Sequence, residues 1–254
     1  MSLRKNWRSN AGAAMLAATL LGPSASDAGV VIGATRVVYP EREREVTVKL
    51  TNEGDKPSLV QAWVDDGNAN ALPDDSQVPF TLTPPLFRLD PKKGQSLRLI
   101  YTKEPVTQDQ EVLYWLNVLD VPPQAADDPD TPNVLQLAFR SRLKLFFRPA
   151  GLQGAADESA GKVSWNFTQK PGGGYTLEAT NPTPYHVTFS RFTVKAGKST
   201  WKSDTGGMVA PKSTAQFDVG NVPSLPAGPL QVDYTFLNDY GAGTQGSYAP
   251  KAAR

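Results

Sequence analysis

The sequence predicts an all-β protein made of two antiparallel sandwich domains, and three observations support this fold class. Short segments alternate apolar and polar residues: Val46, Val48 and Leu50 face one way, while Thr47 and Lys49 face the other. Glycine and proline separate such segments at intervals of roughly 8–15 residues, as expected in a sandwich. No window of a dozen residues has a helical period beyond an apolar run near the N-terminus.

The predicted strands fall into two groups along the chain. The first group covers 45–52, 59–64, 96–101, 112–119 and a segment that runs from 133 into 143–149. The second group covers 162–168, 175–180, 186–196, 214–219 and 230–237, with a hairpin turn at the glycines of 172–174. Residues 151–162 are small and polar and read as a connection. We therefore expect an N-terminal domain over 29–150 and a C-terminal domain over 151–254.

The first 28 residues have the pattern of a signal peptide. Basic residues precede an apolar run over 11–22, and the small residues of 26–28 suit a signal peptidase, so we expect cleavage after about Ala28. A retained membrane anchor is the alternative. The apolar run is shorter than the roughly 20 residues needed to span a bilayer, and no later apolar segment approaches that length. The mature chain, from Gly29, is therefore predicted to be exported and to lack a membrane segment.

Composition excludes several classes of partner and cofactor. The chain has 26 basic and 25 acidic residues, so neither nucleic acid nor an anionic membrane surface is the expected partner. It has no cysteine, which excludes disulfides and cysteine-ligated metal. About 226 residues remain after processing, enough for two domains of ordinary size. We expect no metal and no cofactor.

Motifs for catalysis are missing, so the chain is not expected to be an enzyme. There is no Gly-x-Ser-x-Gly elbow, no phosphate-binding loop and no metal spacing of histidines. The single histidine, His186, lies where a turn enters a strand and reads as structural. The acidic pairs and cluster at 65–66, 74–75 and 127–130 read as solvated loop charge rather than as a calcium site.

The segment that ends in Leu143-Lys-Leu-Phe-Phe-Arg-Pro149 is the most informative part of the sequence. Leu135, Leu137 and Phe139 share one face of this predicted strand, because side chains alternate along a strand. Two interpretations remain open from the residues alone. The face either packs inside its own sandwich or is presented to another protein.

Seven strings in order, spread over nearly the whole mature chain, resemble signatures of the periplasmic pilus-assembly chaperones of the chaperone/usher pathway. In the first half they are Thr35-Arg-Val-Val-Tyr-Pro, Trp115-Leu-Asn-Val-Leu-Asp-Val-Pro-Pro, Asn133-Val-Leu-Gln-Leu and Leu143-Lys-Leu-Phe-Phe-Arg-Pro. In the second half they are Asn181-Pro-Thr-Pro-Tyr, Met208-Val-Ala-Pro-Lys-Ser and Leu237-Asn-Asp-Tyr-Gly-Ala.

The resemblance implies two immunoglobulin-like domains arranged as a boomerang, with a cleft between them. It implies a periplasmic chaperone that lends a strand to pilus subunits whose own sandwich is incomplete, and that delivers them to an outer-membrane usher. On this basis Leu135, Leu137 and Phe139 are the donor side chains. The exposed apolar strand also makes self-association of the client-free chaperone a hypothesis.

The resemblance assigns further residues to two tasks. Arg36 and Lys144 match the cations that anchor the C-terminal carboxylate of a client. Lys144 and Leu137 have opposite parity, so twist, a bulge near Ser141 or a cleft on the other face is needed to reconcile their roles. Glu111, Arg148 and Asp239 match a buried ionic link between the domains.

The resemblance also suggests a branch of the family. The connection over 124–132 is of modest length and cysteine is absent, as in the short-connection branch. Contacts of Tyr39 and of residues 80–87 with clients or neighbours are a weaker expectation.

A second hypothesis is an exported two-domain adhesion or carbohydrate-binding protein. Trp63, Trp165 and Trp201 would then form a platform for sugars, although aromatic residues on strands more often belong to a core. An exported hydrolase is a third hypothesis, for which the sequence offers no named nucleophile or base.

Overall fold

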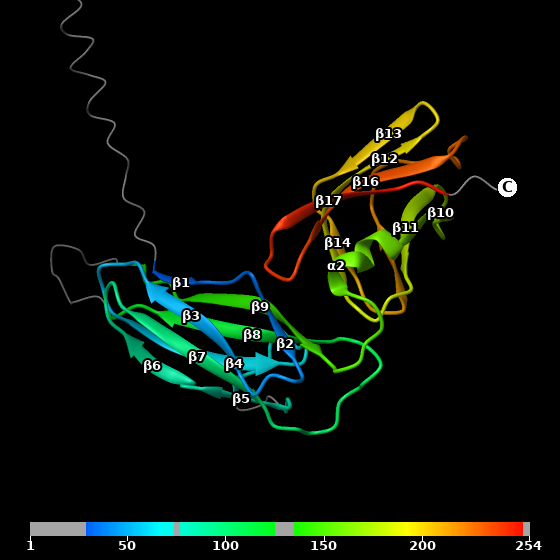
Figure 1. Cartoon of the computed structure of the whole chain (residues 1–254). Coiled ribbons are helices and arrows are strands. Elements are labelled where there is room, and N and C mark those ends of the chain that lie inside the picture. The colour runs from blue at the N-terminus through cyan, green and yellow to red at the C-terminus, as the bar shows by residue number, and fades with distance from the viewer. Residues whose placement is uncertain (1–28, 74–76, 125–134, 251–254) are drawn as a thin grey trace, which may run out of the picture.

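The computed structural model describes residues 29–73, 77–124 and 135–250. Two β-sandwich lobes are set at an angle to each other and meet near one end of the N-terminal lobe (Figure 1). The all-β prediction with two sandwich domains is therefore confirmed. The predicted signal peptide, residues 1–28, lies outside the described residues.

The N-terminal domain consists of two facing sheets. One has the strand order β1-β3-β7-β5 and the other the order β2-β9-β8-β4-β6. The strands are β1 (Val30–Ile32), β2 (Arg36–Pro40), β3 (Val46–Asn52), β4 (Ser58–Asp65), β5 (Phe80–Thr83), β6 (Leu86–Leu89), β7 (Gly94–Tyr101), β8 (Val112–Val121) and β9 (Phe139–Arg148).

The C-terminal domain repeats this architecture. One sheet has the order β10-β11-β15 and the other the order β13-β12-β16-β17, with β14 pairing to β12. The strands are β10 (Ser164–Gln169), β11 (Tyr175–Asn181), β12 (Val187–Ala196), β13 (Ser199–Ser203), β14 (Gly207–Val209), β15 (Ser213–Phe217), β16 (Leu230–Leu237) and β17 (Gly243–Tyr248).

Alternating apolar residues build the core of the N-terminal domain. On β9 the residues Leu143, Leu145 and Phe147 point inward and are buried, because successive side chains of a strand face opposite sides. Tyr39 is completely buried, and its hydroxyl donates to the backbone oxygens of Glu43 and Arg44. The expectation that Tyr39 contacts clients is therefore wrong: this side chain completes the core.

The C-terminal core is assembled around Trp165, which packs against Phe189, Phe192, Phe217 and Tyr234. Trp165 is buried in this cluster. The indole therefore belongs to the domain interior, where it cannot take part in a sugar-binding surface.

Three features differ from the expected sandwich. The pair β2–β9 is parallel, with Arg36 beside Lys144, whereas only antiparallel pairs were expected. The connection over 151–162 contains a short helix, α2 (Ala156–Ser159), followed by a 3₁₀ turn, η3 (Ala160–Lys162). The strand expected from residue 133 begins at Phe139 within the described residues.

Candidate functional site

β9 has one complete and one incomplete neighbour (Figure 1). It pairs with β8 from Phe139 to Phe147, whereas β2 covers only Lys144 to Arg148. Among the residues that the structure describes, no strand pairs with the outer edge of β9 over 139–143. The backbone hydrogen-bonding groups along that edge are available to an added strand.

The three predicted donor side chains lie at the start of this open edge. Leu135, Leu137 and Phe139 are 81%, 52% and 64% exposed, respectively. Leu135 and Leu137 precede β9. The side-chain amide of Gln136, which lies between them, donates to the backbone oxygens of Pro122 and Pro123 at 2.9 and 2.8 Å. The short-branch prediction rests on the connection over 124–132; its residues 125–132 lie outside the described residues, as does Asn133.

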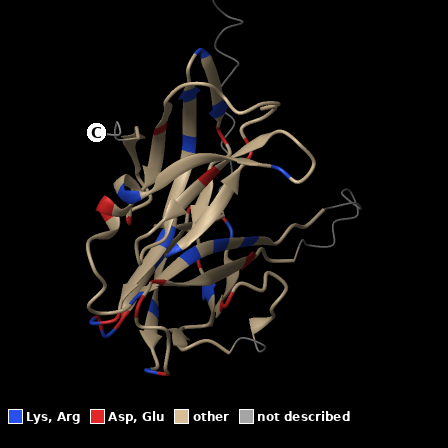
Figure 2. Ribbon diagram, turned by 90° about the vertical axis from the view of Figure 1, so that its right-hand side faces the viewer, with Lys and Arg blue, Asp and Glu red and all other residues tan. Residues whose placement is uncertain are grey.

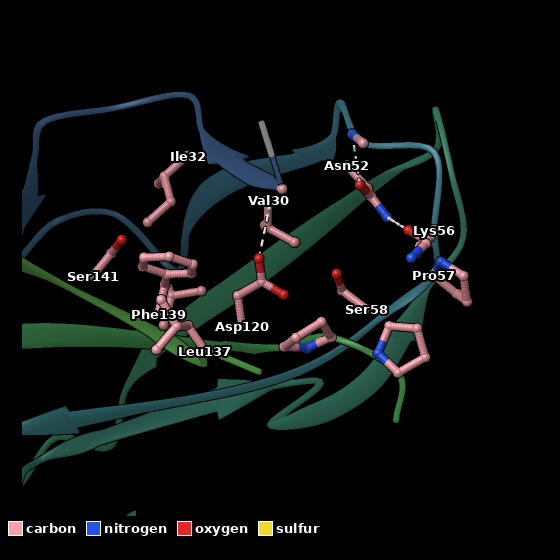
Figure 3. Close-up of a pocket in the computed structure, with 15 residues that line it drawn as sticks. Val30, Ile32, Asn52, Lys56, Pro57, Ser58, Asp120, Leu137, Phe139 and Ser141 are labelled. Carbon is pink, nitrogen blue, oxygen red and sulfur yellow. Dashed lines mark hydrogen bonds between the residues drawn. The ribbon is translucent and has the colours of Figure 1, made fainter. Parts of the chain in front are cut away.

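Leu137 and Phe139 face a hollow at the open end of the N-terminal sandwich. The hollow has a volume of about 380 Å³ and is also lined by Val30, Ile32 and Val118 (Figure 3). The two side chains thus rest at the margin of their own domain while more than half of each stays in solvent. The sequence left open whether the apolar face of this segment packs inside its own sandwich or is presented to another protein. Leu143, Leu145 and Phe147 pack in the core, whereas the apolar residues before them stay mostly exposed.

The opposite parity of Lys144 is resolved by the second face of the sheet. The register between β8 and β9 runs without a shift from Phe139 to Phe147, so there is no bulge at Ser141. Phe139 therefore shares the inward side with Leu143, whereas Lys144 points to the outer side of the same sheet. Of the three explanations offered by the sequence, the bulge is therefore wrong, and Lys144 is accessible from the outer face of the sheet.

Arg36 and Lys144 lie side by side across the parallel pair β2–β9. The Arg36 Nη1 atom donates to the backbone oxygen of Leu237 in the C-terminal domain at 3.3 Å, and its Nε atom is buried without a partner. The Lys144 Nζ atom lies 3.3 Å from the Met208 Sδ atom, also in the C-terminal domain. Neither cation forms an ion pair with any residue in the described ranges.

Burial destabilises the charged forms of both residues, and Lys144 also feels repulsion from Arg36. Burial lowers the pKa of Lys144, and the charge of Arg36 lowers it further. Burial also lowers the pKa of Arg36, although the carboxylates of Asp239 and Glu111 oppose this shift. Two adjacent cations that lack a paired carboxylate form a site for an anion, because a bound anion would relieve both effects.

Arg148 joins the two domains. Its Nε atom donates to Glu111 at 2.8 Å, and its two terminal nitrogens donate to Asp239 at 2.7 and 2.9 Å. Glu111 is buried and also accepts from the backbone nitrogen of His186 at 2.9 Å, while the His186 Nδ1 atom lies 3.1 Å away. Asp239 is 42% exposed, so half of the link is buried and the other half meets solvent.

These contacts raise the pKa of Arg148. Burial of the guanidinium acts in the opposite direction, but the hydrogen bonds and charges of Asp239 and Glu111 outweigh it. Arg148 therefore remains a cation, and its planar fork meets one carboxylate from each domain.

A second ionic network, which sequence reasoning missed, covers the outer face of the same sheet. Asp65 on β4 is buried and accepts from Asn117 at 2.7 Å and from the Arg142 Nε atom at 3.2 Å. The guanidinium of Arg140 donates to Asn117 at 2.7 Å. The guanidinium of Arg142 lies 4.2 Å from the ring centre of Trp115.

This network had a signal in the sequence. Arg140, Arg142 and Lys144 alternate with the apolar residues of β9, so one face of the strand is basic. Basic and acidic residues otherwise occur on strands and loops of both domains (Figure 2). The sequence did not show which acidic residue pairs with these cations, because only the folded sheet places Asp65 next to Arg140 and Arg142.

The remaining sequence candidates do not form a site. Within residues 29–73, 77–124 and 135–250, no group of histidine and acidic side chains could hold a metal ion. The acidic residues of 74–75 and 127–130 lie outside those ranges. Trp63 is buried beneath Arg140, whose guanidinium is 4.8 Å from the indole ring centre. Trp63 and Trp165 lie in different domains, so the tryptophans form no common platform.

No helix in the described part of the chain has the length and apolar character needed to cross a membrane.

The comparisons with known proteins agree with one another. Residues 29–153 match the family model described as the pili and flagellar-assembly chaperone, PapD N-terminal domain. Residues 158–248 match the model described as the pili assembly chaperone PapD, C-terminal domain. The chain is 43% identical over 244 residues to the chaperone protein FimB/FhaD of Bordetella pertussis, covering 94% of this chain and 96% of that protein.

Two solved structures are also similar. The crystal structure of the YadV chaperone, a protein of Escherichia coli, has a TM-score of 0.73 at 37% identity and covers 89% of this chain and 100% of its own. The Salmonella enterica SafB chaperone, solved in complex with the SafA pilin, has a TM-score of 0.70 at 26% identity and covers 89% of this chain and 99% of the matched chain.

Proposed function

The chain belongs to the PapD family of pilus-assembly chaperones, and from this premise we propose that it acts in the periplasm by donor-strand complementation. In this proposal it binds fimbrial subunits whose sandwich lacks a strand, supplies that strand from β9 and the segment before it, and delivers the subunit to an outer-membrane usher. The role requires binding and release but no bond-breaking chemistry.

The observation that carries the proposal is an unpaired strand edge beside exposed apolar side chains. The edge of β9 over 139–143 has free hydrogen-bonding groups, and Leu135, Leu137 and Phe139 stand next to it. A protein that only closed its own core has no use for this combination, because exposed edges invite aggregation. An incomplete subunit needs both features: backbone pairing for its edges and apolar side chains for its groove.

The apolar side chains supply enough free energy for a stable but reversible complex. Burial of one large apolar side chain contributes about 1.5–3 kcal/mol. Three of them contribute about 5–9 kcal/mol before the cost of association is subtracted. All three are at least half exposed in the free chain, so most of this burial is gained on binding.

Arg36 and Lys144 are proposed to anchor the C-terminal carboxylate of the subunit. Each well-placed hydrogen bond from a cation to a carboxylate contributes about 1.5–3 kcal/mol. Lys144 is the first β9 residue that β2 covers, so it lies directly at the end of the open edge. Anchoring the client terminus there fixes the register of the residues that pair along 139–143.

The distinction between the two faces defines the binding mode. The anchor points to the outer face of the sheet, towards Met208 of the C-terminal domain. Of the donor side chains, Leu137 and Phe139 face the inner side and line the hollow at the end of the sandwich. We infer that the client reaches the anchor from the cleft between the domains and then pairs with β9 as the edge leaves that cleft.

The proposal is tested with a purified fimbrial subunit that aggregates when it is refolded alone. Light scattering is recorded with wild-type chaperone, Leu137→Glu and Lys144→Ala. Leu225→Glu is the matched control, because Leu225 is 59% exposed but lies in the C-terminal domain, far along the chain from the donor segment.

Wild type and Leu225→Glu are expected to suppress aggregation equally. Leu137→Glu should fail because it places a charge in the apolar groove, and Lys144→Ala should lose at least tenfold in affinity because half of the anchor is gone. Protection by both Leu137→Glu and Lys144→Ala at the wild-type level would rule out the donor-and-anchor mechanism.

A further inference from the structure

Asp120 has an unusual position at the open end of the N-terminal sandwich. It lies on β8 with its carboxylate turned towards the start of β1 in the facing sheet (Figure 3). The Asp120 Oδ2 atom accepts from the backbone nitrogen of Val30 at 3.0 Å. The Oδ1 atom is buried and has no hydrogen-bond partner.

A carboxylate in such a position needs more than one amide donor. A buried charged oxygen without a partner is costly, and native structures satisfy nearly all such groups. Among the described residues that line this hollow, the other charged side chain is Lys56, and no ion pair joins it to Asp120. Within the described residues, the counter-charge for Asp120 is therefore not supplied by a side chain.

Gly29 lies against the same carboxylate. A Cβ atom added to Gly29 would be only 2.6 Å from the Asp120 Oδ2 atom, so the carboxylate packs directly on the Gly29 backbone and no larger residue fits without a shift. The backbone oxygen of Gly29 accepts from the nitrogen of Glu53 at 3.1 Å, so Gly29 is also held by a backbone hydrogen bond. The Gly29 backbone thus lies against the Oδ2 side of the carboxylate, next to Val30, whose nitrogen already donates to that oxygen.

We infer that the missing partner of Asp120 is the α-ammonium group of Gly29 itself, formed when the signal peptide is removed. This inference rests on the proposed export and on cleavage after Ala28. Hydrolysis of the Ala28–Gly29 peptide bond consumes one water, leaves a carboxylate on Ala28 and frees an amine on Gly29. That amine takes up a proton, because a chain-terminal amine has a pKa of about 7.7–8.0.

Processing thus replaces a neutral amide by a cation with three donors, next to an acceptor that is already buried. The pair joins β1, which is three residues long and pairs only with β3, to β8 of the opposite sheet. Val30 and Ile32 of β1 form one wall of the hollow that Leu137 and Phe139 face. Signal-peptide removal therefore locks the edge strand that borders the donor side chains.

The test is a two-by-two comparison on the client-free chaperone. Chains starting at Gly29 are compared with chains that carry one additional alanine before Gly29, each with Asp120 and with Asp120→Asn. Thermal unfolding gives Tm, and NMR titration gives the pKa of the α-amine. Asp204→Asn is the matched control, since it removes an exposed carboxylate from the C-terminal domain. Mass spectrometry identifies the first residue of the exported protein.

The exported protein is expected to begin at Gly29. The additional alanine should lower Tm by about 2–4 °C in the wild-type and Asp204→Asn backgrounds and leave it unchanged in Asp120→Asn. The α-amine pKa should lie above its ordinary value with Asp120 and return to that value in Asp120→Asn. A different first residue, an equal Tm loss in all backgrounds, or an α-amine pKa that ignores Asp120 would each overturn the inference. Neither readout involves a client, so a failure of the donor-strand proposal would leave both unchanged.

Discussion

Lys144 combines three properties that suit an anchor for a carboxylate. It is partly buried, it lies beside Arg36, and it forms no ion pair within the described part of the chain. Its pKa is lowered because the free protein offers its charge too little compensation. A client carboxylate would compensate that charge and raise the pKa again.

This proton linkage predicts how client affinity changes with pH. Because the client-bound form holds the Lys144 proton more tightly, affinity is full below the pKa of free Lys144 and falls as the pH rises through it. That fall should begin below pH 10.4, the ordinary value for lysine. Titration of client affinity by fluorescence anisotropy between pH 7 and 10 measures it.

Lys144→Arg is the control for this titration. Arginine keeps its charge over the whole range, so the variant should bind with little change in affinity up to pH 10. The same alkaline loss in wild type and in Lys144→Arg would mean that another group titrates, and the anchor role of Lys144 would have to be abandoned.

At the scale of elements, β9 depends on the network that covers its outer face. Arg142 of β9 donates to Asp65 on β4, and Arg140 of β9 donates to Asn117 on β8, which itself donates to Asp65. Both arginines lie in the part of β9 that β2 does not cover. Four strand positions on three neighbouring strands are thus fixed by charge-assisted hydrogen bonds. The network keeps the open segment of β9 in register while its other edge has no partner.

Asp65 makes this contribution testable. Burial alone would raise the pKa of Asp65, but hydrogen bonds from Arg142, Asn117 and the Gly67 backbone lower it overall. Its stabilising effect is therefore complete above the unfolded-state value of about 3.9 and is lost as the pH falls through the lower folded-state value. We expect Asp65→Ala to reduce the free energy of unfolding by about 2 kcal/mol at pH 7, measured in urea.

The same urea series at low pH supplies the control. Below the folded-state pKa of Asp65 the wild-type carboxylate is protonated, so the difference between wild type and Asp65→Ala should shrink. A difference that stays constant with pH would show that the carboxylate charge is not what stabilises the sheet.

The strand pattern explains which elements the sequence could predict. Long strands such as β3, β8, β12 and β16 carry enough alternation to be recognised. Seven shorter strands were missed, because three to six residues carry too little alternation to be recognised: β1, β2, β5, β6, β13, β14 and β17. The parallel pair β2–β9 joins segments about a hundred residues apart, a contact that no local pattern encodes.

Local sequence patterns predicted less of the candidate site than of the strands. Alternation alone indicated that Leu135, Leu137 and Phe139 share one face, whereas their role as donors and the roles of Arg36 and Lys144 came from the resemblance to a family. Their proximity depends on the parallel pairing, and the contact of Lys144 with Met208 depends on how two domains meet. Such contacts arise only in the folded molecule, which is why sequence reasoning missed them.

At the scale of the whole molecule, Arg148 links the two lobes through one buried and one exposed carboxylate. Glu111 is buried and bonded to Arg148 and His186, whereas Asp239 lies on the turn after β16. An exposed ion pair contributes only about 0–1 kcal/mol to stability. We propose that the Asp239 half mainly fixes the angle between the domains.

Asp239→Ala should therefore loosen the angle without unfolding either domain. The free energy of unfolding should fall by about 1 kcal/mol or less, while small-angle scattering should report a broader distribution of overall dimensions. Glu111→Ala is the contrasting variant and should cost about 3 kcal/mol, since it removes the buried carboxylate and leaves the partly buried Arg148 with only the exposed Asp239. Unchanged scattering together with normal client recovery in Asp239→Ala would contradict the hinge role.

The proposal that β9 supplies a strand to a fimbrial subunit is tested most directly by amide hydrogen exchange, measured in the free chaperone and in its complex with that subunit. If β9 supplies a strand to the client, the amides on its outer edge over 139–143 become paired, and their exchange should slow by at least tenfold on binding, with protection extending to Leu135. Amides over 144–148, already covered by β2, should change little. Protection elsewhere on the chaperone with unchanged exchange over 135–143 would contradict the account.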